Sequence, residues 1–307
     1  MSRNFSRVAL TGILLLPTGL ASAQGQEKIT IAVVGGTTFG FPASFGAGLV
    51  QEEGSLTVET KAGSSPPIYK LRYQGVPFYY VRMHGEEALR EGEPPGWHMV
   101  KTFAALRELG VTHVFGGATS GSVNPDYDFD DLVIVDDFLV IGNQRPQSIL
   151  RAAGIKRPGV FPSFAVPFCP DLRRLLIEEA KKSYHAGIYE TGVILQDDPG
   201  RFETPAEVRM MRTLGGDMVT HNVGTEAIYA RQLGMHFALL QSISNPATGV
   251  RPFTYENMQD SVGRIARGAV PLLLEAVRRV PEIQHTCGIG CTGEPYEGSY
   301  TRKTPRD

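Results

Sequence analysis

Residues 192–214 read GVILQDDPGRFETPAEVRMMRTL and combine an apolar run, a polar loop and an amphipathic segment in one stretch. The apolar run at residues 192–195 predicts a buried strand. A helix start follows the loop, with an N-cap hydroxyl, a proline in the first turn and a glutamate three residues after the cap: Thr204, Pro205 and Glu207. Apolar residues at helical spacing then predict the helix itself: Val208, Met211 and Leu214.

Strand-like and helix-like runs of this kind alternate along most of the chain. Further apolar, β-rich runs lie at residues 29–34, 69–73, 76–81, 111–115, 132–135, 216–219 and 237–243. The runs at residues 69–73 and 76–81 are joined by Gln74 and Gly75 and predict a β-hairpin. Amphipathic helical patterns lie at residues 99–109, 171–182, 227–233 and 260–280. Because strands that alternate with helices form parallel sheets covered on both faces, we expect a single α/β domain with a mixed, mostly parallel central sheet flanked by helices.

The composition of the chain is that of an ordinary globular protein. Its 307 residues are 42% hydrophobic and 20% charged, which is ample for one large hydrophobic core. The formal net charge is −2, so the chain has no excess of basic residues with which to bind a phosphate backbone. We therefore do not expect a nucleic-acid partner.

The first residues have the pattern of a secretory signal peptide. Arg3 and Arg7 precede an apolar run at residues 8–20, which ends in Ala21-Ser22-Ala23. Positive charge, a short apolar stretch and small residues at its end are typical of an exported protein. We expect residues 1–23 to be cleaved and the protein to be periplasmic, with no membrane attachment afterwards; the alternative is an uncleaved anchor.

The C-terminal residues 282–307 are polar and rich in glycine, and we expect them to form a flexible tail after a domain at residues 24–281. Cys287 and Cys291 in this tail could form a disulfide after export or remain two free thiols. A zinc site there would need a fourth ligand that is not visible nearby in the sequence. Cys169 lies elsewhere, between Phe168 and Pro170, and we expect it to pack as a small hydrophobic residue.

Polar side chains accumulate where the predicted strands end, which is where ligands bind in open α/β sheets. Gly35-Gly36-Thr37 follows the first strand and could present backbone N–H groups and a hydroxyl to an anion, or simply form a tight turn. Arg82 and His84 end another strand and would point to the same face of it. A cation beside an imidazole suits an oxyanion, although a solvent-exposed strand end is the plainer interpretation.

Phe202 and Glu203 lie side by side at the junction between the predicted strand and the capped helix. An aromatic ring can stack on a flat ring, and a carboxylate can accept hydrogen bonds from ring N–H groups. The pair therefore suits a purine base. The capped helix start alone would explain Thr204 and Glu207, but it leaves Glu203 without a role.

Taken in order, these motifs resemble those of the trimeric purine nucleoside phosphorylase and methylthioadenosine phosphorylase family. The resemblance covers residues 28–280 and is carried by seven segments: Gly35-Gly36-Thr37, Arg82-x-His84, Gly121-Ser122-Val123-Asn124-Pro125, Arg145-Pro146-Gln147-Ser148, Pro167-Phe168-Cys169-Pro170, Phe202-Glu203-Thr204-Pro205-Ala206-Glu207 and Ser244-Asn245-Pro246-Ala247-Thr248-Gly249. The resemblance implies a nucleoside phosphorylase-like fold and a homotrimer. It also implies phosphorolysis of purine nucleosides to free base and ribose 1-phosphate.

The resemblance further implies a role for each matching residue. The phosphate co-substrate would be bound by a set of polar side chains near C1′: Thr37, Arg82, His84, Thr119 and Asn222. The base would be bound by three residues: Phe202, Glu203 and Asn245. Asn245 and His84 would be the catalytic pair, and neither a metal nor a cofactor is implied. His221 stands where the family usually has methionine, and would either bind a ribose hydroxyl or fill the space of that methionine.

The residues at the base favour one branch of the family. Asn245 can donate to N7 or O6 of the purine, and Glu203 can accept from N1–H, as in hypoxanthine or guanine. We therefore expect a 6-oxopurine substrate, namely inosine, guanosine or methylthioinosine. The alternatives are a methylthioadenosine phosphorylase, a non-catalytic exported nucleoside-binding protein, and a hydrolase that uses water in place of phosphate.

Overall fold

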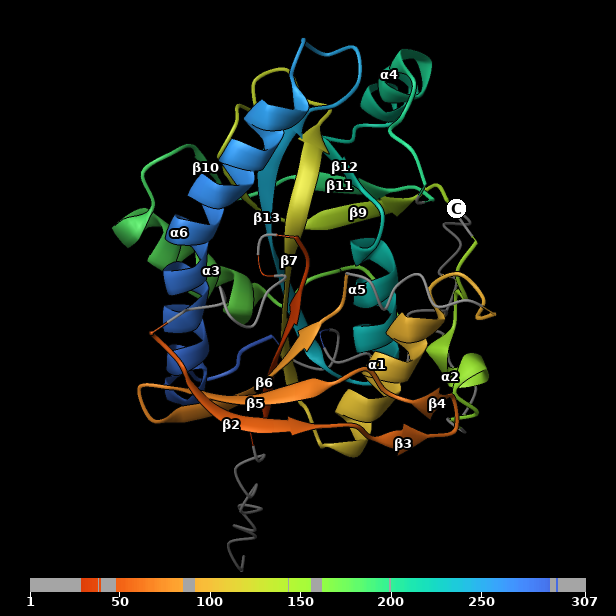
Figure 1. The fold of residues 1–307 in the computed structure, drawn as a ribbon, viewed down its shortest axis with the longest axis vertical. Coiled ribbons are helices and arrows are strands. Elements are labelled where there is room, and N and C mark those ends of the chain that lie inside the picture. Colours follow the sequence, from red (N-terminus) through yellow and green to blue (C-terminus); the bar gives the residue numbers. More distant parts are fainter. Residues whose placement is uncertain are drawn as a thin grey trace, which may run out of the picture.

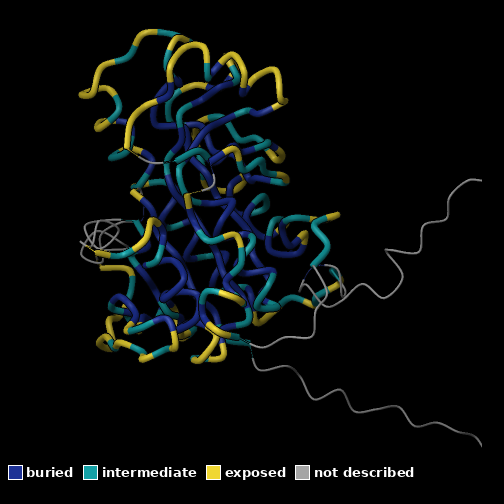
Figure 2. The backbone as a smooth tube through the Cα atoms, turned by 90° about the vertical axis from the view of Figure 1, so that its right-hand side faces the viewer, coloured by how far each residue is buried: buried dark blue, intermediate teal, exposed yellow. Residues whose placement is uncertain are grey.

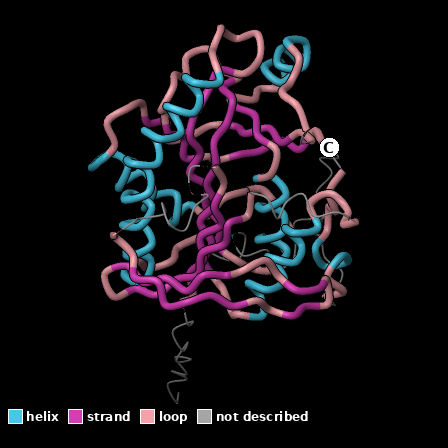
Figure 3. The backbone as a smooth tube through the Cα atoms, in the orientation of Figure 1, coloured by secondary structure: helices cyan, strands magenta, loops and turns pink. Residues whose placement is uncertain are grey.

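The computed structural model of the protein describes residues 29–37, 39, 48–84, 92–142, 144–155, 162–198, 200–287 and 291. An 11-stranded mixed sheet forms the centre of this structure, and helices cover it on both sides (Figures 1 and 3). This confirms the predicted fold class. The predicted signal peptide lies outside the described residues, and no helix within them is long and apolar enough to cross a membrane.

Four neighbouring parallel strands form the middle of the sheet, in the order β13 (His236–Pro246), β7 (His113–Ser122), β1 (Ile31–Gly35) and β6 (Val76–Arg82). All five residues of β1 are buried. Successive side chains of a strand point to opposite faces of a sheet. In β1, Ala32 and Val34 accordingly belong to one hydrophobic cluster and Ile31 and Val33 to the other. The strand is thus covered on both faces.

Antiparallel strands extend the sheet beyond β6. The predicted hairpin is present as β5 (Ile68–Tyr73) and β6, joined through Gln74 and Gly75. β2 (Gln51–Leu56) continues the sheet beside β5, and β3 (Glu59–Thr60) and β4 (Gly63–Ser64) form a separate two-stranded sheet. The strands β2, β3 and β4 were not predicted, because their sequences are largely polar and their residues are mostly exposed.

A second group of strands branches from the far end of β7. There β7 pairs with β12 (Met218–Thr220) in antiparallel orientation, and β11 (Val193–Gln196) joins β12 to β9 (Asp137–Val140) by parallel pairing. On the other side, β8 (Leu132–Ile134) pairs with β13, and β10 (Ile188–Tyr189) pairs with β8. The cavity of the candidate site lies where β12 meets β7 and the end of β13.

The strand β7 is longer than the sequence predicts. We expected a strand at residues 111–115, but β7 continues to Ser122. Its glycines leave room for aromatic rings, because a Cβ on Gly117 would lie 2.2 Å from Cε2 of Phe39 and one on Gly116 would lie 2.8 Å from Cζ of Phe237. Here the glycines permit close packing and do not form a loop.

Helices pack on the two faces of the sheet. One face is covered by α3 (Pro170–Ser183) and α6 (Tyr255–Arg279), and the other by α1 (Trp97–Glu108) and α5 (Val223–Gln232) (Figure 1). The short helix α2 (Ile149–Ala152) lies beside α1 and α5, and α4 (Pro205–Thr213) lies near the end of β7 and β12. Buried segments follow the sheet through the molecule, and exposed segments lie around its periphery (Figure 2).

The beginning of the segment that we predicted as a flexible tail packs against the domain. A 3₁₀ turn at Val280–Glu282 ends α6, and Ile283 and Cys287 then contact the hydrophobic cluster that contains α3 and α6. Cys291 is only 3% exposed.

Leu239→Ala should destabilise the protein by about 2–5 kcal/mol, because Leu239 is fully buried in the central strand β13 and the substitution leaves a cavity. Leu214→Ala is the matched control, since Leu214 is 52% exposed, and its cost should stay within about 0.5 kcal/mol. Urea unfolding of both variants measures the difference. Equal costs would contradict the placement of β13 in the core.

Candidate active site

A cavity of about 320 Å³ opens where the parallel strands of the sheet end. Residues that follow β1, β6 and β12 meet residues of β7 and β13 in its walls, and the first turns of α6 close one side. Most of the residues singled out in the sequence line it: Thr37, His84, Thr119, Phe202, Glu203, His221, Asn222 and Asn245. Segments far apart in the sequence therefore meet at one site, as expected for the carboxyl ends of a parallel sheet.

Two nearly buried polar side chains face this cavity. Glu203 is 5% exposed and Asn245 is 4% exposed. The hydroxyl of Ser244 donates to Asn245 Oδ1 at 2.9 Å, and Asn245 Nδ2 donates to the carbonyl oxygen of Pro246 at 3.0 Å. These contacts fix the plane of the amide and leave its second N–H free to meet a ligand.

The capped helix start positions the stretch that carries Glu203. The Thr204 hydroxyl accepts from the Glu207 N–H at 3.2 Å, and Glu207 Oε2 accepts from the Thr204 N–H at 2.7 Å. This reciprocal pair is the predicted capping box, and it holds the backbone just after Glu203. Phe202 lies at the mouth of the cavity, 54% exposed, with its ring edge-on to Phe253.

A cluster that the sequence analysis missed surrounds Glu203. The side chains of Asp197, Glu203 and His221 approach one another to within 4.8 Å, and His221 Nδ1 lies 2.6 Å from Asp197 Oδ1. Burial, together with the neighbouring Asp197 carboxylate, raises the pKa of Glu203. Asp197 lies in a polar loop after β11, and nothing in the local sequence distinguished it from the adjacent Asp198.

His84, another residue of the cavity wall, belongs to a second pair that was not predicted. His84 Nε2 lies 2.6 Å from Oε1 of Glu226, a fully buried residue near the start of α5. The Glu226 carboxylate accepts from the Nε2–H and so fixes the ring. Gly36 permits this arrangement, because a Cβ there would lie 2.7 Å from His84 Nδ1 and 2.4 Å from the Ala118 Cβ.

Asn222 is held by an arginine that the sequence analysis quoted without giving it a role. Arg145 Nη2 donates to Asn222 Oδ1 at 3.1 Å. Arg145 is 4% exposed, and burial lowers the pKa of its guanidinium. Because the side-chain oxygen of Asn222 accepts from Arg145, the side-chain N–H groups of Asn222 remain to face the cavity.

Arg82 does not line the cavity formed by the described residues. We expected Arg82 and His84 to share one face of a strand, but β6 ends at Arg82. The N–H groups of Met83 and His84 both approach the carbonyl oxygen of Gly35, at 3.0 and 3.3 Å. The regular pairing of the strand therefore stops here, and His84 lines the cavity whereas Arg82 is the last residue of β6.

The helix α6 contributes residues to the cavity that were also missed. We predicted this helix at residues 260–280, but it begins at Tyr255. Its additional first turn brings Met258 and Gln259 to the cavity wall. The available signal was a capping box, in which Thr254 and Asn257 exchange side-chain and backbone hydrogen bonds.

Comparisons with known proteins agree with this fold and site. Residues 30–278 match the model of the phosphorylase superfamily. A probable 6-oxopurine nucleoside phosphorylase of Moorella thermoacetica is 30% identical over 84% of this chain and 95% of that protein. The 6-oxopurine nucleoside phosphorylase of Pyrococcus furiosus is 28% identical over 86% of this chain and 85% of that protein.

Among solved structures, a mutant adenosine/methylthioadenosine phosphorylase of Schistosoma mansoni in complex with adenine superposes with a TM-score of 0.72 and 22% identity, covering 84% of this chain and 94% of that one. At this level of identity the likeness concerns the fold. The sheet, the cavity at its strand ends and the sequence match are together those of a phosphorylase. The chain belongs to the phosphorylase superfamily.

Glu203→Gln should stabilise the folded protein at about pH 8 and much less at about pH 4. The raised pKa of Glu203 means that the folded state keeps this proton to a higher pH than the unfolded chain, so wild-type stability falls as the pH rises through that interval. Glutamine has no proton to lose there. Urea unfolding at both pH values, with the exposed Glu52→Gln as control, measures the effect. A stability gain that is equal at both pH values would argue against a raised pKa of Glu203 as its cause.

Proposed function

We propose that the protein catalyses the phosphorolysis of purine nucleosides that carry a 6-oxopurine base, releasing the free base and ribose 1-phosphate. The observation that carries this proposal is the meeting of Glu203 and Asn245 in one cavity that His84 also lines. A base can be bound at one side of this cavity and an anion at the other. The names of the relatives in Moorella thermoacetica and Pyrococcus furiosus support the same reaction.

Base recognition follows from the polar atoms of the two buried residues. The free N–H of Asn245 can donate to N7 or O6 of the purine, and an ionised Glu203 can accept from N1–H. Adenine has no hydrogen on N1 and would leave Glu203 unpaired in a buried site. An unsatisfied buried polar group costs about 1–3 kcal/mol, so this site should prefer hypoxanthine and guanine.

The same contacts promote departure of the base. When phosphate attacks C1′, the glycosidic bond breaks and its electron pair moves onto the purine. An N–H of Asn245 aimed at N7 or O6 then meets growing negative charge, and it interacts more strongly with the transition state than with the substrate. Phosphate itself is the nucleophile in this scheme, so the protein needs no covalent bond to the sugar.

The phosphate side is built from neutral donors and one histidine. Thr37, Thr119 and Asn222 offer hydroxyl or amide hydrogens around His84. Nε2–H of His84 donates to Glu226, so Nδ1 is left to exchange a hydrogen bond with a phosphate oxygen. On the sugar, His221 is held by Asp197 and can bind a ribose hydroxyl. The homotrimer and the export expected from the sequence also belong to this proposal.

The deciding experiment measures base release from inosine, guanosine, methylthioinosine, adenosine and methylthioadenosine, with and without phosphate. We expect hypoxanthine and guanine to be released only with phosphate. Release of adenine from methylthioadenosine as the main reaction would assign the methylthioadenosine branch. Equal turnover in phosphate-free buffer would indicate a hydrolase. Tight nucleoside binding in calorimetry without turnover would indicate a binding protein.

Asn245→Ala should lower kcat for inosine by about 10²–10³, because it removes the donor that stabilises charge on the leaving base. KM for inosine should change much less. Asn245→Asp should shift the preference from inosine toward adenosine, because a carboxylate accepts from a 6-amino group. The matched control is Asn124→Ala, whose side chain binds Asp217 away from the cavity. An unchanged kcat in Asn245→Ala would remove this residue from the mechanism.

Glu226→Gln should raise KM for phosphate by at least about tenfold while changing KM for inosine little. The neutral amide holds His84 less firmly, because a hydrogen bond to a charged group contributes about 1.5–3 kcal/mol. Steady-state kinetics with each substrate varied in turn measures both constants. The exposed Glu52→Gln serves as the control. A larger effect on inosine than on phosphate would show that the phosphate lies elsewhere.

A further inference from the structure

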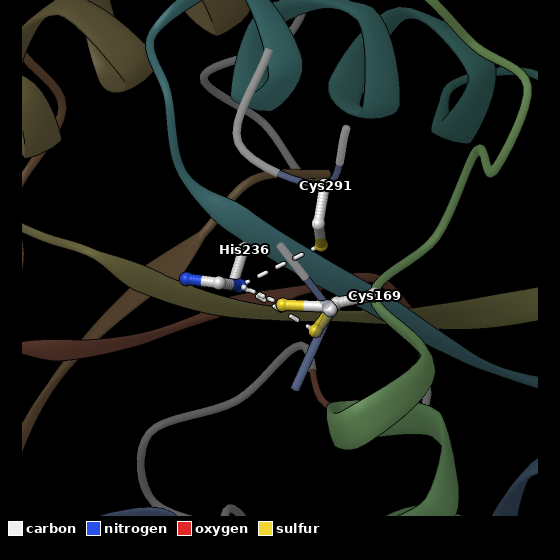
Figure 4. Close-up of side chains that lie close together, drawn as sticks. Cys169, His236 and Cys291 are labelled. Atoms are coloured by element: carbon white, nitrogen blue, oxygen red, sulfur yellow. Dashed lines mark hydrogen bonds between the residues drawn. The ribbon is translucent and has the colours of Figure 1, made fainter. Parts of the chain in front are cut away.

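Three cysteines and one histidine converge at the opposite end of β13 from the proposed active site. The Sγ atoms of Cys169, Cys287 and Cys291 lie 3.5, 3.4 and 3.5 Å from Nδ1 of His236. Figure 4 shows the side chains of Cys169 and Cys291 pointing toward the His236 ring. His236 is the first residue of β13, and Asn245 follows nine residues later, so the two ends lie roughly 30 Å apart along an extended strand.

This arrangement extends two expectations from the sequence. Cys169 is buried in a hydrophobic cluster, as we predicted, and its sulfur also faces the two cysteines of the C-terminal segment. The fourth ligand that a zinc site would need is also present, since the fold brings Cys169 and His236 to Cys287 and Cys291. All three cysteines are free thiols in the structure, with no disulfide between them.

The spacing of the four atoms is that of a tetrahedral metal site. Zinc binds cysteine sulfur at about 2.3 Å and histidine nitrogen at about 2.0–2.1 Å, so a tetrahedral angle gives sulfur-to-nitrogen edges of about 3.5–3.6 Å. The three observed edges, from 3.4 to 3.5 Å, agree with this value. All four ligand atoms lie within 4.8 Å of one another.

Hydrogen bonding does not account for the same geometry. The Nδ1 atom of an imidazole has either one lone pair or one hydrogen, so it can satisfy one sulfur well and cannot satisfy three at nearly equal distances. A disulfide does not account for it either, since that bond joins two sulfurs at about 2.05 Å and leaves the third and the histidine unused. A single cation at the centre contacts all four atoms.

We propose that Cys169, His236, Cys287 and Cys291 bind one Zn²⁺ ion in a closed, tetrahedral Cys₃His site. Zinc replaces the three thiol protons, which leave to solvent, and His236 binds through its neutral Nδ1. Three thiolates and one dication give the site a net charge of −1. Because all four positions are taken by protein ligands, the ion holds structure together and activates no water.

A buried cation accompanies the proposed site. Arg231 is 2% exposed and lies close enough to interact electrostatically with the sulfurs of all three cysteines. Its Nη2 donates to the carbonyl oxygens of Val166 and Pro167, and its Nη1 has no hydrogen-bond partner among the described residues. A guanidinium buried beside neutral thiols lacks a compensating charge. Beside a site of net charge −1, the same guanidinium is neutralised.

Asp171, in the first turn of α3, holds the segment that delivers Cys287. Its carboxylate accepts from the backbone N–H and hydroxyl of Thr286, at 2.6 and 2.9 Å, and from the backbone N–H of Cys287 at 3.0 Å. A zinc ion beside these contacts would join the C-terminal segment to α3 and β13. This explains why Cys291 is buried far beyond the end of α6.

Histidines beside the site offer a competing ligand set. His113 and His285 pack against the His236 ring with centroids 4.6 Å away, and their Nε2 atoms lie 2.8 Å apart. The Cys₃His set is favoured because thiolates bind zinc strongly and because the three sulfurs surround His236 Nδ1 evenly. His285→Ala separates the two possibilities.

The test begins with elemental analysis of the purified full-length chain. We expect about one zinc per chain in the wild type, the same in His285→Ala, and a loss of at least about tenfold in Cys291→Ser and Cys287→Ser. Loss of zinc in His285→Ala but not in Cys291→Ser would overturn the assignment. A metal-free wild type that takes up no zinc after reduction, or whose intact mass shows a disulfide between two of these cysteines, would overturn it as well.

Two further measurements keep the proposal testable if the cysteine variants fold poorly. Replacement of zinc by Co²⁺ in the wild type should give the intense visible absorption of a tetrahedral ion and a near-ultraviolet band from thiolate ligands. Weak absorption typical of an octahedral ion would contradict the proposed site. Zinc removal from the wild type by a strong chelator should lower Tm and make the chain more sensitive to proteases after α6. Neither measurement depends on the proposed reaction, and an unchanged Tm would contradict a structural zinc ion.

Discussion

The ladder between β7 and β13 is the contact on which both sites depend. The two strands pair in parallel over almost their whole length, from His236 opposite His113 to Pro246 opposite Ser122. Both strands are buried nearly throughout, so their register is fixed by packing on two faces. A change of register by one residue would move Asn245 out of the cavity and His236 away from the three sulfurs. One pairing therefore positions a ligand cavity at one end and a sulfur cluster at the other.

The cavity is shaped by carboxylates that hold other polar groups. Glu226 holds His84, and Asp197 holds His221. Burial, together with the neighbouring Asp197 carboxylate, makes the charged form of Glu203 costly before a ligand arrives. A base that donates from N1 would compensate that charge. The free protein therefore contains an unfavourable buried carboxylate, and ligand binding would relieve this cost. Titratable groups with shifted pKa values are common in functional sites.

Much of the fold was predictable from the sequence, because strand and helix signals are local. The helix start at Thr204 and the hairpin at Gln74 and Gly75 were predicted nearly as they occur. The errors also have local causes. Polar strands such as β2 carry no apolar alternation, and the glycines of β7 resemble a loop until Phe39 and Phe237 occupy the space beside them.

The sequence by itself determined the order of the motifs and the polar residues at the strand ends. From these followed the α/β fold, the family resemblance and the pair formed by Glu203 and Asn245. Only the tertiary structure decided which residues support that pair, because the contact between His84 and Glu226 spans 142 positions in the chain. The same holds for the cluster of three cysteines and one histidine, in which Cys169 and His236 are 67 positions apart. Sequence periodicity reports which face of an element is buried, but the packing of the sheet and helices decides which side chains meet there.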